Sequence, residues 1–173
     1  MEKVRITVEG YKVTHHANQV IPHVRVVDSA LAIKRIESAM GDLVLQGKPK
    51  FICIEGHSGS GKTSLSLALT SNGMNVKCIN TIEELEKAEN LEKQRMSKTS
   101  IAHLLVDQSV TYVIDELGIA DADCAPILKS HLEQGGVLVA LLQDKRDLTF
   151  DIGIEPVWFR LNGTPGTLDL VNL

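Results

Sequence analysis

The chain has 173 residues, of which 43% are hydrophobic and 23% are charged, and its formal net charge is −4. This composition is that of an ordinary soluble globular domain, and the acidic balance argues against a domain that holds nucleic acid by bulk positive charge. No apolar run reaches the roughly 18 residues of a membrane-spanning helix, and no apolar signal core follows the charged N-terminus. We therefore expect a cytoplasmic protein without membrane insertion.

Residues 1–49 are predicted to form an N-terminal extension that consists of a β-hairpin and a helix. Apolar and polar residues alternate in part over residues 3–13, which is typical of a hairpin or of two short strands. Asp28 and Ser29 are favourable N-caps for the following helix, and Gly41 is its expected stop. We expect this extension to offer a surface for oligomerisation or for a partner.

Residues 50–173 are predicted to form one nucleotide-binding domain in which strands and helices alternate. Such alternation indicates an α/β fold with a mostly parallel sheet between two helical layers. Thr81 with Glu84 has the pattern of a capping box at one helix start, and the chain should end in a β-hairpin. The predicted strands are 51–54, 76–79, 111–114, 137–142, 157–161 and 167–171. One predicted helix begins at Lys62, a second begins at Thr81, a third covers 101–107 and a fourth contains Pro126.

Residues 56–63 read GHSGSGKT and fit the pattern G-x-x-x-x-G-K-[ST], between a predicted strand and a predicted helix. The glycines let backbone N–H groups point into one concavity, which forms an anion site together with the helix N-terminus. The segment resembles the Walker A motif of P-loop NTPases and implies bound ATP or another nucleoside triphosphate, with Mg²⁺. Lys62 would then neutralise the β- and γ-phosphates, and the Thr63 hydroxyl would bind the metal. The expected nucleotide-binding residues are Gly56, His57, Ser58, Gly59, Ser60, Gly61, Lys62, Thr63 and Ser64.

Residues 112–116 read YVIDE and place two acids at the carboxyl end of a buried strand, where ligands collect in open α/β sheets. The segment resembles a Walker B motif, which implies that Asp115 holds Mg²⁺ and that Glu116 polarises the attacking water. The adjacent acids also resemble the branch of P-loop ATPases with a catalytic glutamate and one strand inserted between the Walker A and Walker B strands. Residues 64–110 leave room for such a strand at Val76–Ile79.

Gln143 directly follows the apolar strand 137–142, where a polar side chain would face the γ-phosphate or the attacking water, so we count it among the catalytic candidates. Together with residues 113–116 and the glycines at 135–136, it gives a weak resemblance to FtsK/HerA-type pumping ATPases and Zot-like proteins. That resemblance implies an ATPase subunit that powers a nucleic-acid or assembly process.

ATPases of this kind often act as rings, in which an arginine finger from one subunit stabilises charge at the site of the next. Arg146 and Arg160 are the basic residues best placed for this role in the predicted order of elements. We therefore expect a homo-oligomer, and nucleic acid or a larger machine is a further partner hypothesis.

Other functions remain open at this stage. Asp115 and Gly118 also fit the D-x-x-G motif of GTPases, and residues 144–147 resemble their N-K-x-D motif with Asp in place of Asn. These two segments are too close in sequence for the α–β unit that GTPases place between them. A small-molecule or nucleoside kinase is the second alternative, and a nucleotide-gated binding module with negligible turnover is the third.

Overall fold

The structure is a computed structural model in which two short N-terminal strands, β1 (Arg5–Ile6) and β2 (Val13–Thr14), pair antiparallel. The rest of the predicted N-terminal hairpin, including Gly10, lies outside the described residues. The described residues are 5–6, 13–14, 28–71, 75–164 and 167–173.

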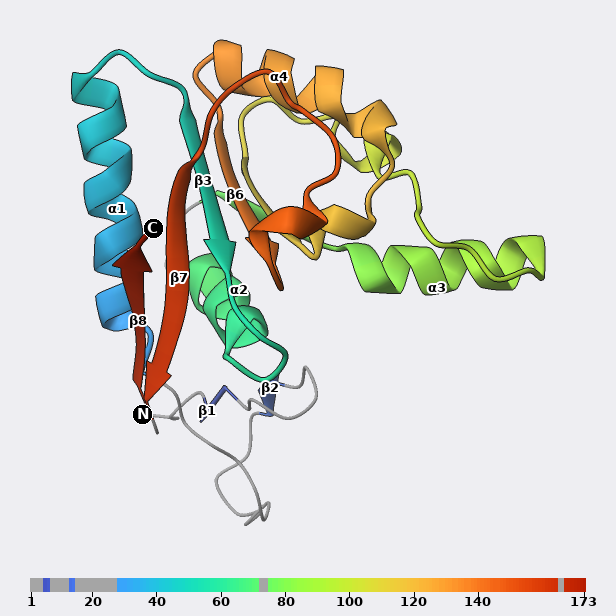
Figure 1. The fold of residues 1–173 in the computed structure, drawn as a ribbon, viewed down its shortest axis with the longest axis horizontal. Helices are drawn as coiled ribbons and strands as arrows, with labels where there is room; N and C mark the ends of the chain where they lie inside the picture. Colours follow the sequence, from blue (N-terminus) through green and yellow to red (C-terminus); the bar gives the residue numbers. More distant parts are fainter. Residues whose placement is uncertain (1–4, 7–12, 15–27, 72–74, 165–166) are drawn as a thin grey trace.

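The centre of the molecule is a six-stranded sheet with the order β4-β5-β6-β3-β7-β8 (Figure 1). Its first five strands in this order are parallel, and β8 pairs antiparallel with β7 as the predicted C-terminal hairpin. The strands are β3 (Lys50–Glu55), β4 (Val76–Asn80), β5 (Thr111–Asp115), β6 (Val137–Leu142), β7 (Val157–Thr164) and β8 (Thr167–Asn172).

One strand does lie between the strand that precedes the glycine-rich loop and the strand that carries Asp115, but it is β6. We expected the strand at Val76–Ile79 in connection with this insertion, whereas β4 lies at the edge of the sheet beyond β5. The expectation followed chain order, whereas a crossover connection in a parallel sheet can place the next strand of the chain away from its predecessor.

Helices cover both faces of the sheet, as predicted, and side chains of each strand alternate between the two apolar layers. In β5, Val113 packs in the layer with α1 and α2, while Tyr112 and Ile114 pack in the layer with α4. The α-helices are α1 (Ala30–Leu45), α2 (Lys62–Ser71), α3 (Thr81–Glu92) and α4 (Ala125–Glu133), and the 3-10 helices are η1 (Ala102–Leu104), η2 (Leu117–Ile119), η3 (Ala122–Cys124) and η4 (Lys145–Asp147).

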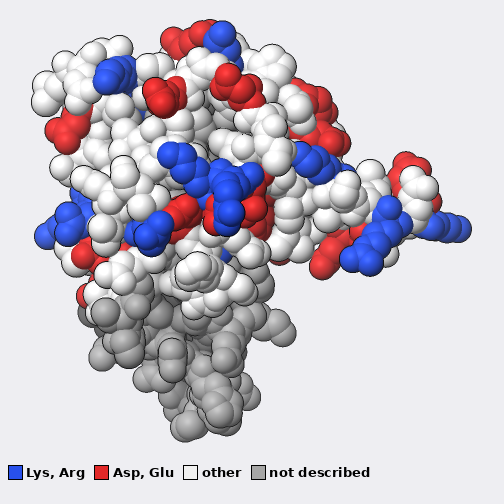
Figure 2. All heavy atoms as spheres, viewed as in Figure 1, with Lys and Arg blue, Asp and Glu red and all other residues white. Residues whose placement is uncertain are grey.

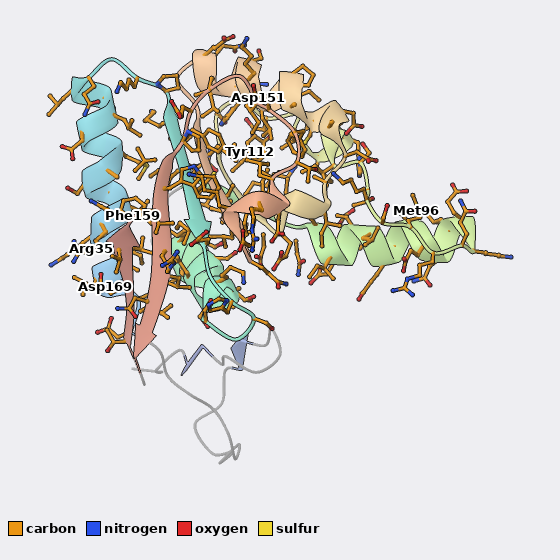
Figure 3. The ribbon with its side chains drawn as sticks, viewed as in Figure 1. Arg35, Met96, Tyr112, Asp151, Phe159 and Asp169 are labelled. Atoms are coloured by element: carbon orange, nitrogen blue, oxygen red, sulfur yellow. The ribbon has the colours of Figure 1, made fainter. Side chains whose placement is uncertain are left out.

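Helix α1, from the predicted N-terminal extension, packs against β3, β8 and α2. Ile36 is fully buried in the same layer as α2, and Arg35 forms a 2.7 Å ion pair with Asp169 of β8 (Figure 3). The division of the chain between residues 49 and 50 stays a prediction.

The stop of α1 at Gly41 was predicted wrongly, because the helix continues to Leu45. A glycine inside a helix costs about 1 kcal/mol, and burial of Leu43 on the sheet offsets that cost. The helix ends before Gly47, whose φ of 65° is the left-handed conformation common at helix ends.

The capping box at Thr81 was also predicted wrongly. Asn80 is the N-cap of α3, and its side-chain oxygen accepts hydrogen bonds from the backbone N–H groups of Ile82 and Glu83 at 3.2 and 3.4 Å. The helix predicted over 101–107 is reduced to the single turn η1, since residues on either side of that turn are buried in the α4 layer and hold the chain in an irregular path.

Helix α3 projects sideways from the carboxyl end of the sheet (Figure 1). On the face in Figure 2, Lys and Arg side chains lie among Asp and Glu side chains rather than in a patch of one sign. Within the described part of the chain, every helix is too short or too polar to cross a membrane.

Candidate nucleotide site

The glycine-rich segment forms a loop between β3 and α2, and its glycines are required by the backbone path. Gly59 and Gly61 have φ values of 77° and 103°, which favour glycine. A Cβ on Gly61 would also lie 2.6 Å from a methyl carbon of Leu168, and one on Gly56 would lie 2.5 Å from Ser60 Oγ. The loop is therefore curled tightly against the β7–β8 pair.

Lys62, the first residue of α2, extends its side chain back into this curl. Its Nζ donates to the carbonyl oxygens of Gly56 at 2.5 Å and His57 at 3.2 Å. The same ammonium lies 3.7 Å from Glu116 Oε1, and only 7% of the side chain is exposed. A buried positive charge therefore lies between the loop and the end of β5.

Asp115 ends β5 and faces the first turn of α2. Its Oδ2 accepts a 3.3 Å hydrogen bond from the Thr63 hydroxyl, whereas its Oδ1 is buried without a hydrogen-bond partner. Burial raises the pKa of Asp115, and the charge of Lys62 and the Thr63 hydrogen bond oppose that rise. An unpartnered buried carboxylate oxygen is costly.

This pair of oxygen groups fits Mg²⁺. Magnesium in nucleotide sites usually takes one or two carboxylates and the substrate phosphates as ligands, and a cation would satisfy Asp115 Oδ1. Thr63 and Asp115 are the residues that could hold it.

Glu116 directly follows the strand and has an unusual backbone conformation, with φ 57° and ψ 48°. Left-handed non-glycine residues are uncommon and cluster at functional sites, because the surrounding structure must enforce them. Burial raises the pKa of Glu116; Lys62 and a hydrogen bond from the Gln143 side chain lower it, and Asp115 raises it further. A carboxylate with a raised pKa is suited to accept a proton.

These groups meet in one cavity of about 230 Å³ at the carboxyl end of the sheet. Ile82, at the start of α3, also lines this cavity, although sequence analysis missed it. Its only signal in the sequence was its position just after a predicted strand. The predicted residues that line the cavity are Ser58, Gly59, Gly61, Lys62, Thr63, Ser64, Asp115, Glu116 and Gln143.

The other predicted loop residues reach the site differently. Gly56 and His57 contribute carbonyl oxygens to Lys62, and Ser60 donates its backbone N–H to His57 at 3.1 Å. The Ser60 hydroxyl is buried without a hydrogen-bond partner. The roles of all these residues stay predictions.

Both arginine-finger candidates are exposed and form ion pairs within the chain. Arg146 lies 2.8 Å from Asp144, and Arg160 lies 2.7 Å from Glu55. Neither lines the cavity that contains Lys62. Their action on a neighbouring subunit stays a prediction.

A larger cavity, of about 890 Å³, lies away from this site between α1 and the start of β7. Its lining mixes apolar residues such as Leu31 and Phe159 with charged residues such as Lys34 and Glu155. It contains none of the predicted site residues.

No protein-family model matches the chain, and no curated protein sequence is similar to it. Among solved structures, the chain is similar to the RuvB Holliday junction branch migration motor of Thermotoga maritima, with 17% identity and a TM-score of 0.44 over 68% of this chain and 39% of RuvB. It is also similar to AMPPCP-bound DnaA from Aquifex aeolicus, with 18% identity and a TM-score of 0.42 over 70% of this chain and 40% of DnaA. The chain thus spans about two-fifths of the length of these structures.

The fold follows from the loop and the sheet themselves. A G-x-x-x-x-G-K-[ST] loop joins a central parallel strand to a helix, and an Asp-Glu pair lies at the end of a strand that one further strand separates from it in the sheet. The FtsK/HerA resemblance stays a prediction. The chain has the three-layer α/β fold of the P-loop NTPase superfamily.

Proposed function

We propose that this chain binds a nucleoside triphosphate, with ATP as the expected nucleotide, together with Mg²⁺ and hydrolyses it. The observation that supports this most strongly is the buried, unpartnered oxygen of Asp115 in the same cavity as Lys62 and Glu116. One cavity then contains an ammonium that can bind phosphate, an oxygen that can bind a metal ion and a carboxylate that can activate water.

Each group has a defined task in this proposal. The N–H groups of the loop and the Lys62 ammonium bind the β- and γ-phosphates. On nucleotide binding, Lys62 exchanges its contacts with Glu116 and the loop carbonyls for contacts with these phosphates. Thr63 and Asp115 hold Mg²⁺, which neutralises charge on the phosphate oxygens. Glu116 accepts the proton of the attacking water, and Gln143 orients Glu116 or that water.

Hydrolysis is favoured over transfer to another acceptor because Glu116 lies beside Lys62 at 3.7 Å, where it can activate water. The test is release of phosphate from ATP and from GTP with Mg²⁺, by the wild-type chain and by Glu116→Gln. We expect free phosphate from the wild type, and an almost complete loss of turnover in the variant with nucleotide binding retained. An unchanged rate in Glu116→Gln, or phosphate found on an added acceptor instead of in solution, would contradict the proposal.

The process that hydrolysis drives is a second part of the proposal. We propose that the chain is an ATPase subunit in a nucleic-acid or assembly process and that it acts as a homo-oligomer. This rests on the Asp-Glu strand followed by a strand that ends before Gln143. Phosphate release should rise on addition of DNA or of the assembly partner, and the size in solution should increase with ATP. A monomeric size both with and without ATP would contradict the proposed homo-oligomer.

A further inference from the structure

Glu55 is the last residue of β3 and immediately precedes the phosphate-binding loop. The four residues before it are buried and apolar, and the side chain of Glu55 itself is only 12% exposed. A carboxylate at such a position is costly unless it is well hydrogen-bonded. Its partners therefore indicate why it is there.

Both carboxylate oxygens of Glu55 are hydrogen-bonded, each to a different neighbour. Oε1 accepts from Arg160 Nε at 2.9 Å and from Arg160 Nη2 at 2.7 Å, and these residues are direct partners in the β3–β7 register. Oε2 accepts from the backbone N–H of Lys145 at 3.1 Å. One side chain thus connects the start of the phosphate-binding loop to β7 and to the turn after β6.

That turn follows Gln143 and is held by hydrogen bonds of its own. Asp144 caps η4 by accepting from the Arg146 N–H, and Asp147 accepts from the Asp144 N–H at 2.9 Å. Gln143 enters the turn directly from β6, and it lines the same cavity as Glu116. A displacement of the turn therefore displaces Gln143 relative to Glu116.

We propose that Glu55 is a positioning residue that holds the turn after β6 in place, and with it Gln143 against Glu116. Arg160 of β7 holds the Glu55 carboxylate in place, and the carboxylate in turn holds the backbone N–H of Lys145 in the turn. The role of Arg160 is then within its own subunit. This inference rests on the proposed hydrolysis for its kinetic part only, because the hold of Glu55 on the turn is a structural property.

The structural part can be measured without nucleotide. Trp158 is the single tryptophan of the chain, and the Lys145 ammonium lies 5.0 Å from the centre of its ring. Its fluorescence therefore reports the position of the turn. We expect a shifted Trp158 emission in Glu55→Ala, a smaller shift in Glu55→Gln, which keeps one acceptor, and no shift in the control Arg35→Ala, which breaks the Arg35–Asp169 pair on α1 and β8. Unchanged emission in Glu55→Ala would overturn the proposal.

The kinetic part separates positioning from a general loss of stability. We expect Glu55→Ala to lower kcat about tenfold with KM for ATP little changed, since a misplaced catalytic group costs rate rather than ground-state binding. Glu55→Gln should retain more activity, and Arg35→Ala should match the wild type. If Glu55→Ala folds poorly, Glu55→Gln carries both measurements.

A double-mutant cycle with Gln143→Ala tests the connection itself. Glu55→Ala should cause no further loss of kcat in the Gln143→Ala background, because the group that it positions is already absent. Equal losses in both backgrounds, or a shifted emission with unchanged kcat, would overturn the connection to Gln143. A wild-type chain without hydrolysis would refute the proposed function, while the emission of Glu55→Ala would still decide whether Glu55 holds the turn.

Discussion

The backbone of Glu116 offers a prediction that compares two variants at one site. Its φ of 57° and ψ of 48° are left-handed, which costs roughly 1–2 kcal/mol for a residue with a Cβ. Glycine adopts this conformation without that cost but loses about 0.5–1 kcal/mol through its freer unfolded chain. We therefore expect Glu116→Gly to be more stable than Glu116→Ala by about 0.5–1 kcal/mol. Both variants lack the carboxylate, so effects of charge cancel in the comparison.

Urea unfolding followed by the Trp158 fluorescence or by circular dichroism measures this difference. In a chain of this size, 1 kcal/mol corresponds to a shift in Tm of roughly 2–4 °C. Lys93, the C-cap of α3, has a φ of 54° and supplies an exposed control in which glycine should also be more stable than alanine. If alanine and glycine were equally stable at position 116 but not at position 93, the backbone strain assigned to Glu116 would be refuted.

Three further outcomes follow from the contacts of single residues. Because burial raises the pKa of Glu116 above its ordinary 4.5, the folded chain binds that proton more tightly than the unfolded chain. When urea unfolding is measured at a series of pH values, the free energy of unfolding of the wild type should thus fall relative to that of Glu116→Gln as pH rises from about 4.5 through the raised pKa. The same dependence of this free energy on pH in both proteins would contradict this. Gly61→Ala should lose roughly 1–3 kcal/mol of stability, because its Cβ would lie too close to Leu168, and it should bind ATP more weakly in calorimetry. Gly41→Ala has open space around the added Cβ and should gain about 1 kcal/mol of stability. Asn80→Ala should cost about 1 kcal/mol in urea unfolding, and no cost would contradict its assignment as the cap of α3.

The sheet and the phosphate-binding loop were predictable because both depend on local sequence. Apolar segments such as 137–142 are short, bounded by glycines or acids, and buried on both faces, so their pattern alone predicts a strand. The loop needs glycines at fixed positions for steric reasons that hold in any such loop, as the close approach of Leu168 to Gly61 illustrates.

Features that depend on tertiary contacts were predicted wrongly or missed. The helix α1 continues through Gly41 because the following turn packs on the sheet, and the chain after Ser100 forms only a short turn because its apolar residues fit the α4 layer. Glu55 carried no motif, since its partners Arg160 and Lys145 are distant in sequence and are brought to it only by the order of strands β6-β3-β7. Local pattern does not contain that order.

The affinity of the Lys62→Ala variant for ATP tests the central claim most directly. Calorimetric titration with ATP and Mg²⁺ should give an affinity about 10- to 100-fold weaker than that of the wild type, since a hydrogen bond to a charged group contributes roughly 1.5–3 kcal/mol. Lys87→Ala, which removes an exposed lysine paired with Glu84 on α3, should bind ATP as the wild type does. Equal affinity in the wild type and in Lys62→Ala would show that the loop and its buried ammonium do not bind the triphosphate.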